Sequence, residues 1–433
     1  MGIARRAESV SSCSAGNQSS SPNHLRSRAR ARSFARAKSF DLNLSARSKN
    51  FDSVASGFSA TTQQLPAASE RQVRCVHGRE VATVRLKGRS RETPTDNRSR
   101  LAQLRFVMAN ILVVGGAGYI GSHTCLDLFN KGFTPIAYDN LSNGHLEFVK
   151  WGPLEKGDIR DRDRLDEVFK KYRPSAIVHF AAAIEVGESV RDPSAFYENN
   201  VSGTITLLRA AQAASVNKIV FSSTCATYGV PLAIPINETH SQLPINPYGR
   251  SKLIVEQILR DLDLYQGVRS FILRYFNAAG ADPQGRIGEW HSPETHAVPL
   301  AIETALGRRP HFRVLGTDYD TRDGSCIRDF VHVLDLAEAH TRSVESLLSG
   351  SASHAFNLGT GHGISVKELL KNVQQVVGDF KVEYGPRREG DSPSLVADNS
   401  LARQTIGWRP QHDLKSIICT AANWHSNYLP RLV

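Results

Sequence analysis

Short apolar runs alternate with helix-like stretches along the chain from residue 110 onward. Residues 110–114 (NILVV) form a run of strand length, which is typical of a buried parallel strand. Comparable apolar runs occupy residues 175–183, 217–224 and 268–277. Helical patterns lie between them, for example over 203–214. This alternation predicts an α/β fold, a doubly wound parallel sheet with ligands bound at the carboxyl ends of its strands.

A glycine-rich turn follows the first of these strands. Gly115, Gly118 and Gly121 are spaced GxxGxxG and lead into a helical pattern. Glycines in this arrangement let the backbone approach a pyrophosphate, and the start of the helix offers free N–H groups to it. The next apolar strand ends with Asp139, and an acid at that place can accept hydrogen bonds from adenosine ribose hydroxyls. The combination predicts dinucleotide binding, with NAD favoured over NADP because a carboxylate repels a 2′-phosphate.

The pattern changes beyond "NAAGADPQG" (277–285), where segments rich in Gly, Pro and Asp interrupt helical stretches. We therefore expect residues 108–279 to form an NAD-binding Rossmann domain. Residues 280–433 are expected to form mainly a smaller C-terminal α/β substrate-binding lobe. Parts of 325–360 read as a strand and a helix that return to the main sheet.

The first 107 residues have a different composition. They are rich in Ser, Arg and Ala, as in "RSRARARSFARAKSF", and they show no sustained apolar period, so we expect disorder. They hold 20 Lys+Arg and 7 Asp+Glu, a net charge of +13 against +11 for the whole chain. The rest of the chain is therefore near neutral, and the basic total says nothing about its partners.

Three interpretations of residues 1–107 remain open. The chain has two methionines, and the second, Met108, stands just before the first strand of the main body, which fits a start site assigned too far upstream. The Arg- and Ser-rich, acid-poor composition also fits a transit peptide. A basic arm that touches RNA or anionic lipid is the third interpretation.

Composition excludes several classes for the main body. No apolar run approaches the about 20 residues of a membrane span, and no basic stripe is interleaved with aromatic residues as in nucleic-acid binders. The six cysteines are scattered without a CxxC pair, which argues against a disulfide framework or a metal site. We expect a cytoplasmic protein with no membrane, nucleic-acid or metal partner.

The candidate chemistry lies in "YGRSK" (248–252). Tyr248 and Lys252 are four residues apart and share one face of a helix. A neighbouring ammonium group lowers the pKa of a phenol, so Tyr248 is predicted to act as a base on a substrate hydroxyl. Lys252 can also hold the nicotinamide ribose. Thr224 ends the strand at 217–224 and offers a hydroxyl to the same substrate oxygen.

Several segments, in order along the chain, resemble the UDP-glucose 4-epimerase branch of the extended short-chain dehydrogenase/reductase family. They include "GGAGYIGSHT", "DNLSNG", "SSTCATYG", "INPYGRSK", "LRYFNAAGADP", "CIRDFVHVLDLA" and "PRREGD". The resemblance begins near residue 109 and reaches the C-terminus. It implies reversible epimerisation at C4 of a UDP-hexose, UDP-galactose to UDP-glucose, through a 4-keto intermediate with tightly bound NAD. Tyr248 would be the base, Lys252 would tune its pKa and hold NAD, and Thr224 would hydrogen-bond the substrate O4.

The resemblance also implies two sets of binding residues. The NAD set is Gly115, Gly118, Tyr119, Ile120, Gly121, Asp139, Asn140, Asn143, Asp158, Ile159, Phe180, Ala181, Asn199, Tyr248, Lys252 and Phe276. The UDP-sugar set is Thr224, Asn277, His296, Arg328, Arg388 and Asp391. A structural ion pair remains the alternative for Arg328, a solvated charge for Arg388, and a surface position for His296.

The sugar itself stays open. Thr224 is followed by Cys225 and Ala226 with no acid, which disfavours the dehydratase and decarboxylase relatives. A UDP-xylose/UDP-arabinose 4-epimerase is the main alternative. Leu395 stands where the family sets the size of the sugar pocket, so acceptance of N-acetylated sugars is undecided. Ile184 stands where many members have a lysine near the cofactor.

The resemblance further implies a homodimer that associates through two long helices, one from "NVSGTITLLRAAQAA" and one carrying Tyr248. The pathway, galactose metabolism or polysaccharide biosynthesis, is not decided by the sequence. A non-catalytic NAD-binding regulator is disfavoured because Tyr248, Lys252 and Thr224 are all present.

Overall fold

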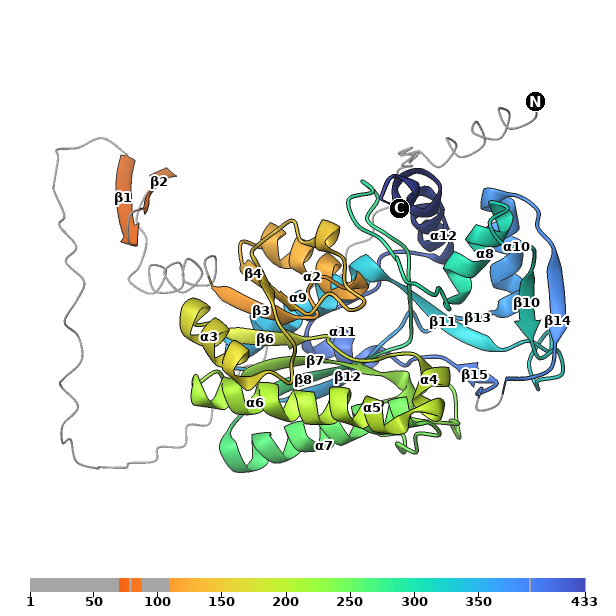
Figure 1. The fold of residues 1–433 in the computed structure, drawn as a ribbon, viewed down its shortest axis with the longest axis horizontal. Helices are drawn as coiled ribbons and strands as arrows, with labels where there is room; N and C mark the ends of the chain where they lie inside the picture. Colours follow the sequence, from red (N-terminus) through yellow and green to blue (C-terminus); the bar gives the residue numbers. More distant parts are fainter. Residues whose placement is uncertain (1–69, 78–79, 88–108, 389–390, 433) are drawn as a thin grey trace, which may run out of the picture. The chain divides into compact units, whose positions relative to one another are not determined.

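The computed structural model describes residues 70–77, 80–87, 109–388 and 391–432. The chain divides into two compact units, one spanning residues 15–97 and the other containing residues 98–433. In the first unit, β1 (Glu70–His77) and β2 (Glu80–Lys87) pair as antiparallel strands (Figure 1). The expected disorder of residues 1–107 is therefore wrong for these two strands, whose recurring valines favour β-structure. The remainder of that segment lies outside the described residues.

A seven-stranded sheet organises the second unit, with strand order β12-β8-β7-β6-β3-β4-β5 (Figure 1). Every neighbouring pair in this sheet is parallel. Its strands are β3 (Asn110–Val114), β4 (Thr134–Asp139), β5 (Leu154–Lys156), β6 (Ala176–His179), β7 (Lys218–Thr224), β8 (Arg269–Tyr275) and β12 (His354–Leu358). The predicted fold class, a doubly wound parallel sheet, is confirmed.

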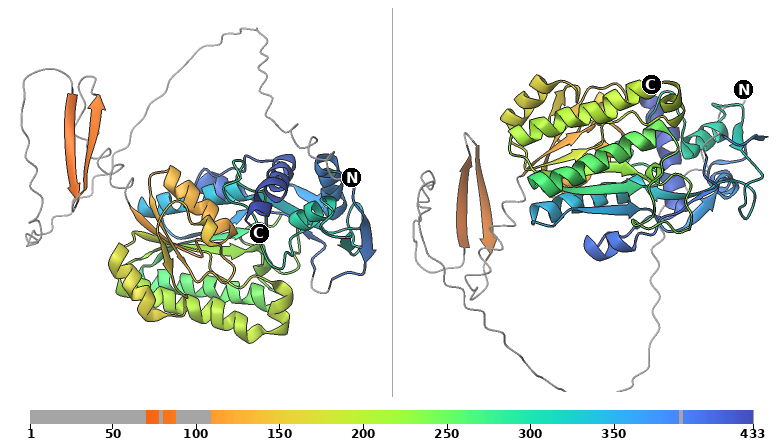
Figure 2. Two further views of the ribbon diagram at one scale, coloured as in Figure 1. Left: turned by 45° about the horizontal axis from the view of Figure 1, so that its top comes forward. Right: turned by 90° about the horizontal axis from the view of Figure 1, so that it is seen from below.

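Helices cover both faces of this sheet. On one face lie α3 (Arg162–Tyr172), α6 (Thr204–Ala213) and α7 (Pro247–Gln266), whose apolar residues share a core with the strands. On the other face lie α2 (Tyr119–Asn130), α9 (Val333–Leu348) and α11 (Ser400–Thr405). Figure 2 shows α6 and α7 in yellow-green and green along one side of the sheet.

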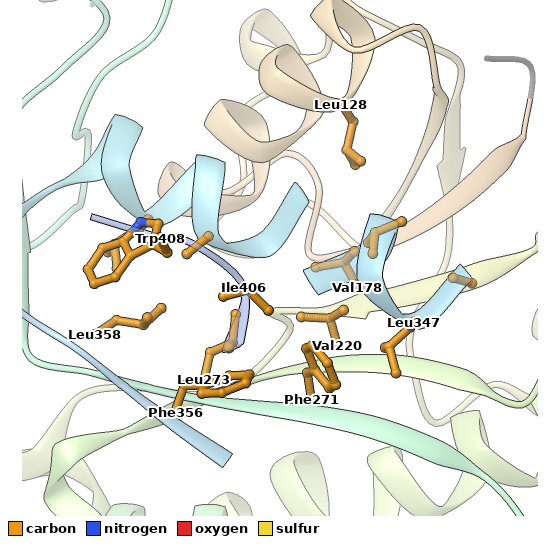
Figure 3. Close-up of a cluster of buried hydrophobic side chains, with 14 of the residues drawn as sticks. Leu128, Val178, Val220, Phe271, Leu273, Leu347, Phe356, Leu358, Ile406 and Trp408 are labelled. Carbon is orange, nitrogen blue, oxygen red and sulfur yellow. The ribbon is translucent and has the colours of Figure 1, made fainter. Parts of the chain in front are cut away.

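The core under α2 and α9 is closed by a segment from near the C-terminus. Trp408 and Ile406 pack with Phe271, Phe356 and Leu358 in this cluster (Figure 3). The Trp408 indole is fully buried, and its Nε1–H donates to the carbonyl of Asp335 in α9 at 2.7 Å. Residues far apart in sequence therefore fix β12 and α9 to the main sheet.

The remaining elements form a smaller group beside the carboxyl ends of the strands. β9 (Asn277–Ala279), β13 (Gly363–Ser365) and β15 (Ser394–Leu395) each pair with β11 (Ile327–His332), while β10 (Phe312–Leu315) pairs with β14 (Val382–Gly385). Three helices share an apolar core there, α8 (Ala297–Ala305), α10 (Val366–Val377) and α12 (Leu414–Asn423). Shorter helices are η2 (Leu146–Phe148), α4 (Val186–Arg191), α5 (Pro193–Tyr197), η3 (Glu198–Gly203), η4 (Cys225–Thr227), η5 (Trp424–Tyr428) and η6 (Leu429–Arg431).

Of the helices in the described ranges, none combines the length and the apolar character that a membrane crossing requires.

Candidate functional site

The turn between β3 and α2 can only be built from glycines at two of its positions. Gly115 has φ +84°, and a Cβ there would lie 2.7 Å from the backbone nitrogen of Ala181. A Cβ on Gly121 would lie 2.0 Å from the carbonyl oxygen of Gly115. Gly118 caps α2, which begins at Tyr119. The turn therefore lets a ligand approach the backbone and the N–H groups at the start of α2, an arrangement that fits a pyrophosphate.

Asp139 lies at the end of β4 beside this turn, as predicted. Its carboxylate accepts hydrogen bonds from the backbone N–H of Ala117 at 2.9 Å and of Leu141 at 2.8 Å. Burial raises the pKa of Asp139 from its ordinary value. The two backbone donors fix the carboxylate, and its remaining lone pairs can accept ribose hydroxyls.

The residues predicted around the adenine lie next to Asp139. The Asn140 amide donates to Asp158 at 3.1 Å, and the Arg160 guanidinium holds the pKa of Asp158 well below its usual range. Ile159 is buried, and a Cβ on Gly203 would lie 2.7 Å from its side chain. Asn143 is exposed.

The loop after β6 forms another wall of the dinucleotide site. The backbone N–H groups of Phe180 and Ala181 both donate to the Val114 carbonyl, at 2.7 and 3.0 Å. The Phe180 side chain packs against the core under α2, as does Ile120. Asn199, in η3, donates through Nδ2 to Oδ1 of Asn200 at 2.9 Å.

Asn200 is a positioning residue that the sequence analysis missed. Its amide exchanges two hydrogen bonds with the backbone of Ala183, at 2.8 and 3.0 Å, and donates to Ser251 Oγ at 3.0 Å. It therefore ties the loop after β6 to α7. The adjacent asparagines in "NNVSGT" were the available signal, and only the burial of Asn200 distinguishes the two.

The structure brings Tyr248 and Thr224 together. The helix α7 begins at Pro247, and its cap Asn246 accepts from the N–H of Gly249 at 2.8 Å, which places Tyr248 in the first turn. Thr224 is the last residue of β7, and its hydroxyl acts on the Tyr248 phenol by lowering the pKa of Tyr248. Thr224 Oγ1 also accepts from the Ala226 N–H at 3.1 Å.

The surroundings of Tyr248 shift the pKa of its phenol upward. Burial raises the pKa of Tyr248, the charges of Tyr275 and Glu185 add to the rise, and the hydrogen bond from Thr224 opposes it. Burial dominates the pKa of Tyr248, and Lys252 is not among the largest contributions to it. The lowering of the Tyr248 pKa by Lys252 stays a prediction.

The Lys252 side chain is directed toward β7. Its Nζ donates to the Ser222 carbonyl at 2.9 Å and lies 5.0 Å from the centroid of the Phe221 ring. Burial lowers the pKa of Lys252 to about 7. The ammonium group is thus held against β7 rather than beside the phenol.

Behind Tyr248 and Lys252 lies a buried polar network that the sequence did not indicate. Glu256, one helical turn after Lys252, accepts from Ser223 Oγ at 2.6 Å and from Arg274 Nη2 at 2.6 Å. Arg274 also donates to the hydroxyl of Tyr228 at 2.8 Å. The network joins α7 to β7 and β8, and so fixes where Tyr248 stands relative to Thr224.

An apolar cluster adjoins the hydroxyl pair on the side of the smaller lobe. Cys225 and Phe276 are buried together, and Leu395 from β15 packs against them. Asn277 begins β9 and is half-buried, opposite Phe330 of β11. The predicted sugar-side residues thus lie on neighbouring strand ends.

The two predicted arginines meet at one carboxylate. Arg328 Nη2 lies 3.5 Å from Asp391 Oδ1, and Arg388 Nη2 lies 2.8 Å from the same atom. Arg328 Nη1 donates to the carbonyls of Ile327 and Ser392 at 2.9 and 2.8 Å. Arg328 is largely buried, whereas the Arg388 side chain is 61% exposed, so Arg388 is the one with freedom to turn toward a ligand.

His296 immediately precedes α8 and faces two carboxylates. Its Nδ1 lies 2.9 Å from Glu289 Oε1 and 3.3 Å from Glu294 Oε1. Burial opposes the charged ring, but the two carboxylates outweigh burial and raise the pKa of His296 to about 10. Its Nδ1 therefore faces acidic groups rather than a nucleotide.

The parallel sheet, the glycine turn and the acid after the second strand define an α/β dinucleotide-binding protein. Residues 111–359 match the NAD dependent epimerase/dehydratase family, and the chain belongs to this family.

Individual relatives agree. The chain is 67% identical over 318 residues to a UDP-glucose 4-epimerase of Rhizobium meliloti (strain 1021), which covers 73% of this chain and 97% of that protein. It is similar to the crystal structure of UDP-glucose 4-epimerase from Brucella ovis in complex with NAD, at 50% identity and a TM-score of 0.71, covering 72% of this chain and 97% of that one. A third match is the crystal structure of UDP-glucose-4-epimerase from Stenotrophomonas maltophila with bound NAD and formylated UDP-arabinopyranose, at 38% identity and a TM-score of 0.73. The match covers 75% of this chain and 100% of that one. The predicted family, enzyme class and NAD dependence are confirmed.

Proposed function

We propose that the chain catalyses the reversible epimerisation of UDP-galactose and UDP-glucose at C4, with NAD held tightly through the cycle. The observation that carries the proposal is the placement of Tyr248, in the first turn of α7, beside Thr224 at the carboxyl end of β7. The identity of 67% to a UDP-glucose 4-epimerase supports the same reaction.

The residues that would hold NAD follow the ends of β3, β4 and β5 or lie on α7. The glycine turn and the start of α2 would take the pyrophosphate, and Asp139 would take the adenosine ribose. Asp158 and Ile159 would flank the adenine, and Lys252 would hold the nicotinamide ribose. When bound, NAD supplies a hydride acceptor, and later a hydride donor, at C4 of the sugar.

Tyr248 acts as the base in this proposal. It removes the proton from the sugar 4-hydroxyl, and Thr224 hydrogen-bonds the same oxygen and keeps it in line with the phenol. Burial raises the pKa of Tyr248, so a positive charge must offset it before the phenol can ionise. Lys252 is the cationic side chain one turn away, and a turn of its ammonium from Ser222 toward the phenol would provide that charge.

The sugar-side residues suit a hexose that must present both faces. Arg328 is fixed by two backbone carbonyls, and with Arg388 it would anchor the diphosphate in place of Asp391. Cys225, Phe276 and Leu395 form an apolar wall that gives the hexose no charged partner. Strong binding of the diphosphate with weak binding of the hexose allows the 4-keto sugar to turn between the two hydride steps.

A UDP-pentose is the second candidate substrate. The Stenotrophomonas maltophila neighbour holds a formylated UDP-arabinopyranose, which supports a pocket that accepts a five-carbon sugar. The test measures kcat/KM for UDP-galactose and for UDP-xylose with the same purified protein and NAD added. A higher value for UDP-galactose supports the hexose, a higher value for UDP-xylose replaces it, and Tyr248→Phe must abolish both.

We also propose a homodimer that associates through α6 and α7. Leu264 and Tyr265, near the end of α7, are 72% and 76% exposed, and apolar side chains on such a surface favour a partner. Sedimentation equilibrium of the purified chain distinguishes a dimer from a monomer.

A further inference from the structure

Two glutamates and two histidines meet on the segment that leads into α8. Glu289, His291, Glu294 and His296 each offer one oxygen or nitrogen atom, and these four atoms all lie within 4.8 Å of one another. The sequence analysis predicted no metal site because it relied on cysteine spacing. The cluster comes instead from "EWHSPETH", whose four side chains fold back on one another.

The separations between these atoms match the edges of a tetrahedral metal site. His291 Nδ1 lies 3.5 Å from Glu289 Oε1 and 3.6 Å from Glu294 Oε2, and His296 Nδ1 lies 2.9 Å from Glu289 Oε1. The 3.3 Å contact between His296 Nδ1 and Glu294 involves the other carboxylate oxygen, Oε1. In a tetrahedral zinc site with ligand bonds of about 2.0–2.1 Å, ligand atoms are about 3.3–3.4 Å apart. All four atoms lie within 4.8 Å of one another, so the cluster would contract around a bound ion to reach that spacing.

Hydrogen bonding does not account for the arrangement. Glu289 Oε1 lies 2.9 Å from His296 Nδ1 and 3.5 Å from His291 Nδ1 as ion pairs, but none of these three atoms makes a hydrogen bond of normal geometry. The Glu289 side chain is only 3% exposed. Buried polar atoms without aligned partners are rare and costly. Nitrogen and oxygen atoms that lie close together without hydrogen-bond alignment fit the ligands of one shared ion.

The surrounding residues hold the cluster in place. One oxygen of Glu294, Oε1, accepts from the N–H groups of Thr295 and His296 at 2.7 and 2.8 Å, which leaves Oε2 as the ligand atom. The Trp424 indole donates to the carbonyl of Glu289 at 2.8 Å. Fixed carboxylates and a fixed backbone are the outer support that metal ligands require.

We propose that Glu289, His291, Glu294 and His296 bind one divalent transition-metal ion of the zinc class as a structural site. Metal binding releases the protons that the carboxylates hold on the two imidazoles. The two carboxylates then carry a charge of about −2, which one divalent cation neutralises. The His291 ring lies edge-on to Tyr119 at 6.1 Å between centroids. The ion therefore fixes the segment before α8 against the glycine turn.

The test uses the full chain without a histidine tag, because a tag would itself bind metal. The protein is stripped with a chelator, dialysed and titrated with zinc chloride, and bound zinc is counted by atomic emission spectrometry. We expect one zinc ion per chain and a saturable rise in Tm as zinc is added. The site variants are His291→Asn and Glu294→Gln, and the matched control is His362→Asn, an exposed histidine with no part in the cluster.

The variants decide the assignment. Each site variant should weaken zinc binding at least as much as the about 10–100-fold typical of losing an outer-shell partner, and His362→Asn should bind zinc as the unaltered chain does. The proposal is overturned if the stripped chain takes up no zinc, or if both site variants bind it unchanged. The proposal is also overturned if both site variants fold normally and the Tm of the unaltered chain does not respond to zinc. The cluster would then be a network of ion pairs with protonated histidines.

Discussion

Breaking the buried pair of Glu256 and Arg274 should cost more stability than breaking the partly exposed pair of Glu256 and Arg260. Arg274 Nε and Nη2 lie 3.0 and 2.6 Å from the Glu256 carboxylate, and the two side chains are 1% and 0% exposed. Arg274→Met removes the cation and leaves a buried carboxylate behind. Removing one partner of a buried ion pair costs about 3–5 kcal/mol of unfolding free energy.

The neighbours of Glu256 place the expected loss of unfolding free energy in Arg274→Met toward the lower end of that range. Gln242, Arg260 and Ser223 continue to donate to the carboxylate after Arg274 is lost. At about 2.1 cal/mol/K per residue over about 320 residues, a loss of about 3–5 kcal/mol lowers Tm by about 4–7 °C. Circular dichroism melting of the variant measures this shift.

Arg260→Met is the matched control, since Arg260 binds the same carboxylate from a position that is 47% exposed. A pair of that kind contributes up to about 1 kcal/mol, so Tm should fall by no more than about 1–2 °C. The double variant Glu256→Leu with Arg274→Met should lose less stability than the sum of the two single changes, because no unpaired charge remains. Equal shifts for Arg274→Met and Arg260→Met, or strict additivity in the double variant, would refute the reasoning.

Three further predictions concern ionisation. Tyr248→Phe should lower kcat by about 10²–10⁴-fold through loss of the base. The amount of NAD released when the variant is denatured should equal that of the unaltered chain. An equal loss of NAD would contradict a purely catalytic role. Glu185→Ala removes a negative charge that raises the pKa of Tyr248. The pKa of Tyr248 should therefore fall, and the acidic limb of the kcat/KM profile should move to lower pH. The control is Glu188→Ala, which should leave the limb in place because the Glu188 carboxylate pairs with Arg191 at 2.9 Å. Burial lowers the pKa of His340 from 6.5 to about 4. The stability contributed by its neutral ring is therefore present above about pH 6.5 and is lost as pH falls toward 4. When Tm is measured from pH 7 to pH 4, it should decline less steeply in His340→Gln than in the unaltered chain.

The parts of the fold that depend on neighbouring residues could be predicted from the sequence. The run from Asn110 to Asp139 contains a strand, a glycine turn, a helix and an acid within one βαβ unit, and each is set by local pattern. The helical spacing of Tyr248 and Lys252 likewise follows from four residues of sequence. Thr224 was found because it ends a clear apolar strand.

The rest depends on contacts between distant segments. Glu256 and Arg274 are both ordinary charged residues in their own elements, and only the packing of α7 on β8 buries them together. The direction of Lys252 is set by the Ser222 carbonyl, which no spacing rule reports. Asp391 reaches Arg328 only because β15 lies beside β11.

The most direct test of the proposed epimerase activity follows UDP-galactose by proton NMR with the purified chain and no added NAD. Appearance of the UDP-glucose anomeric signal, together with release of NAD when the protein is denatured, is the predicted result. It would mean that the hydride cycle is internal and that the nucleotide stays bound. A folded chain that converts no UDP-galactose, even after NAD is added, would contradict the proposed epimerase.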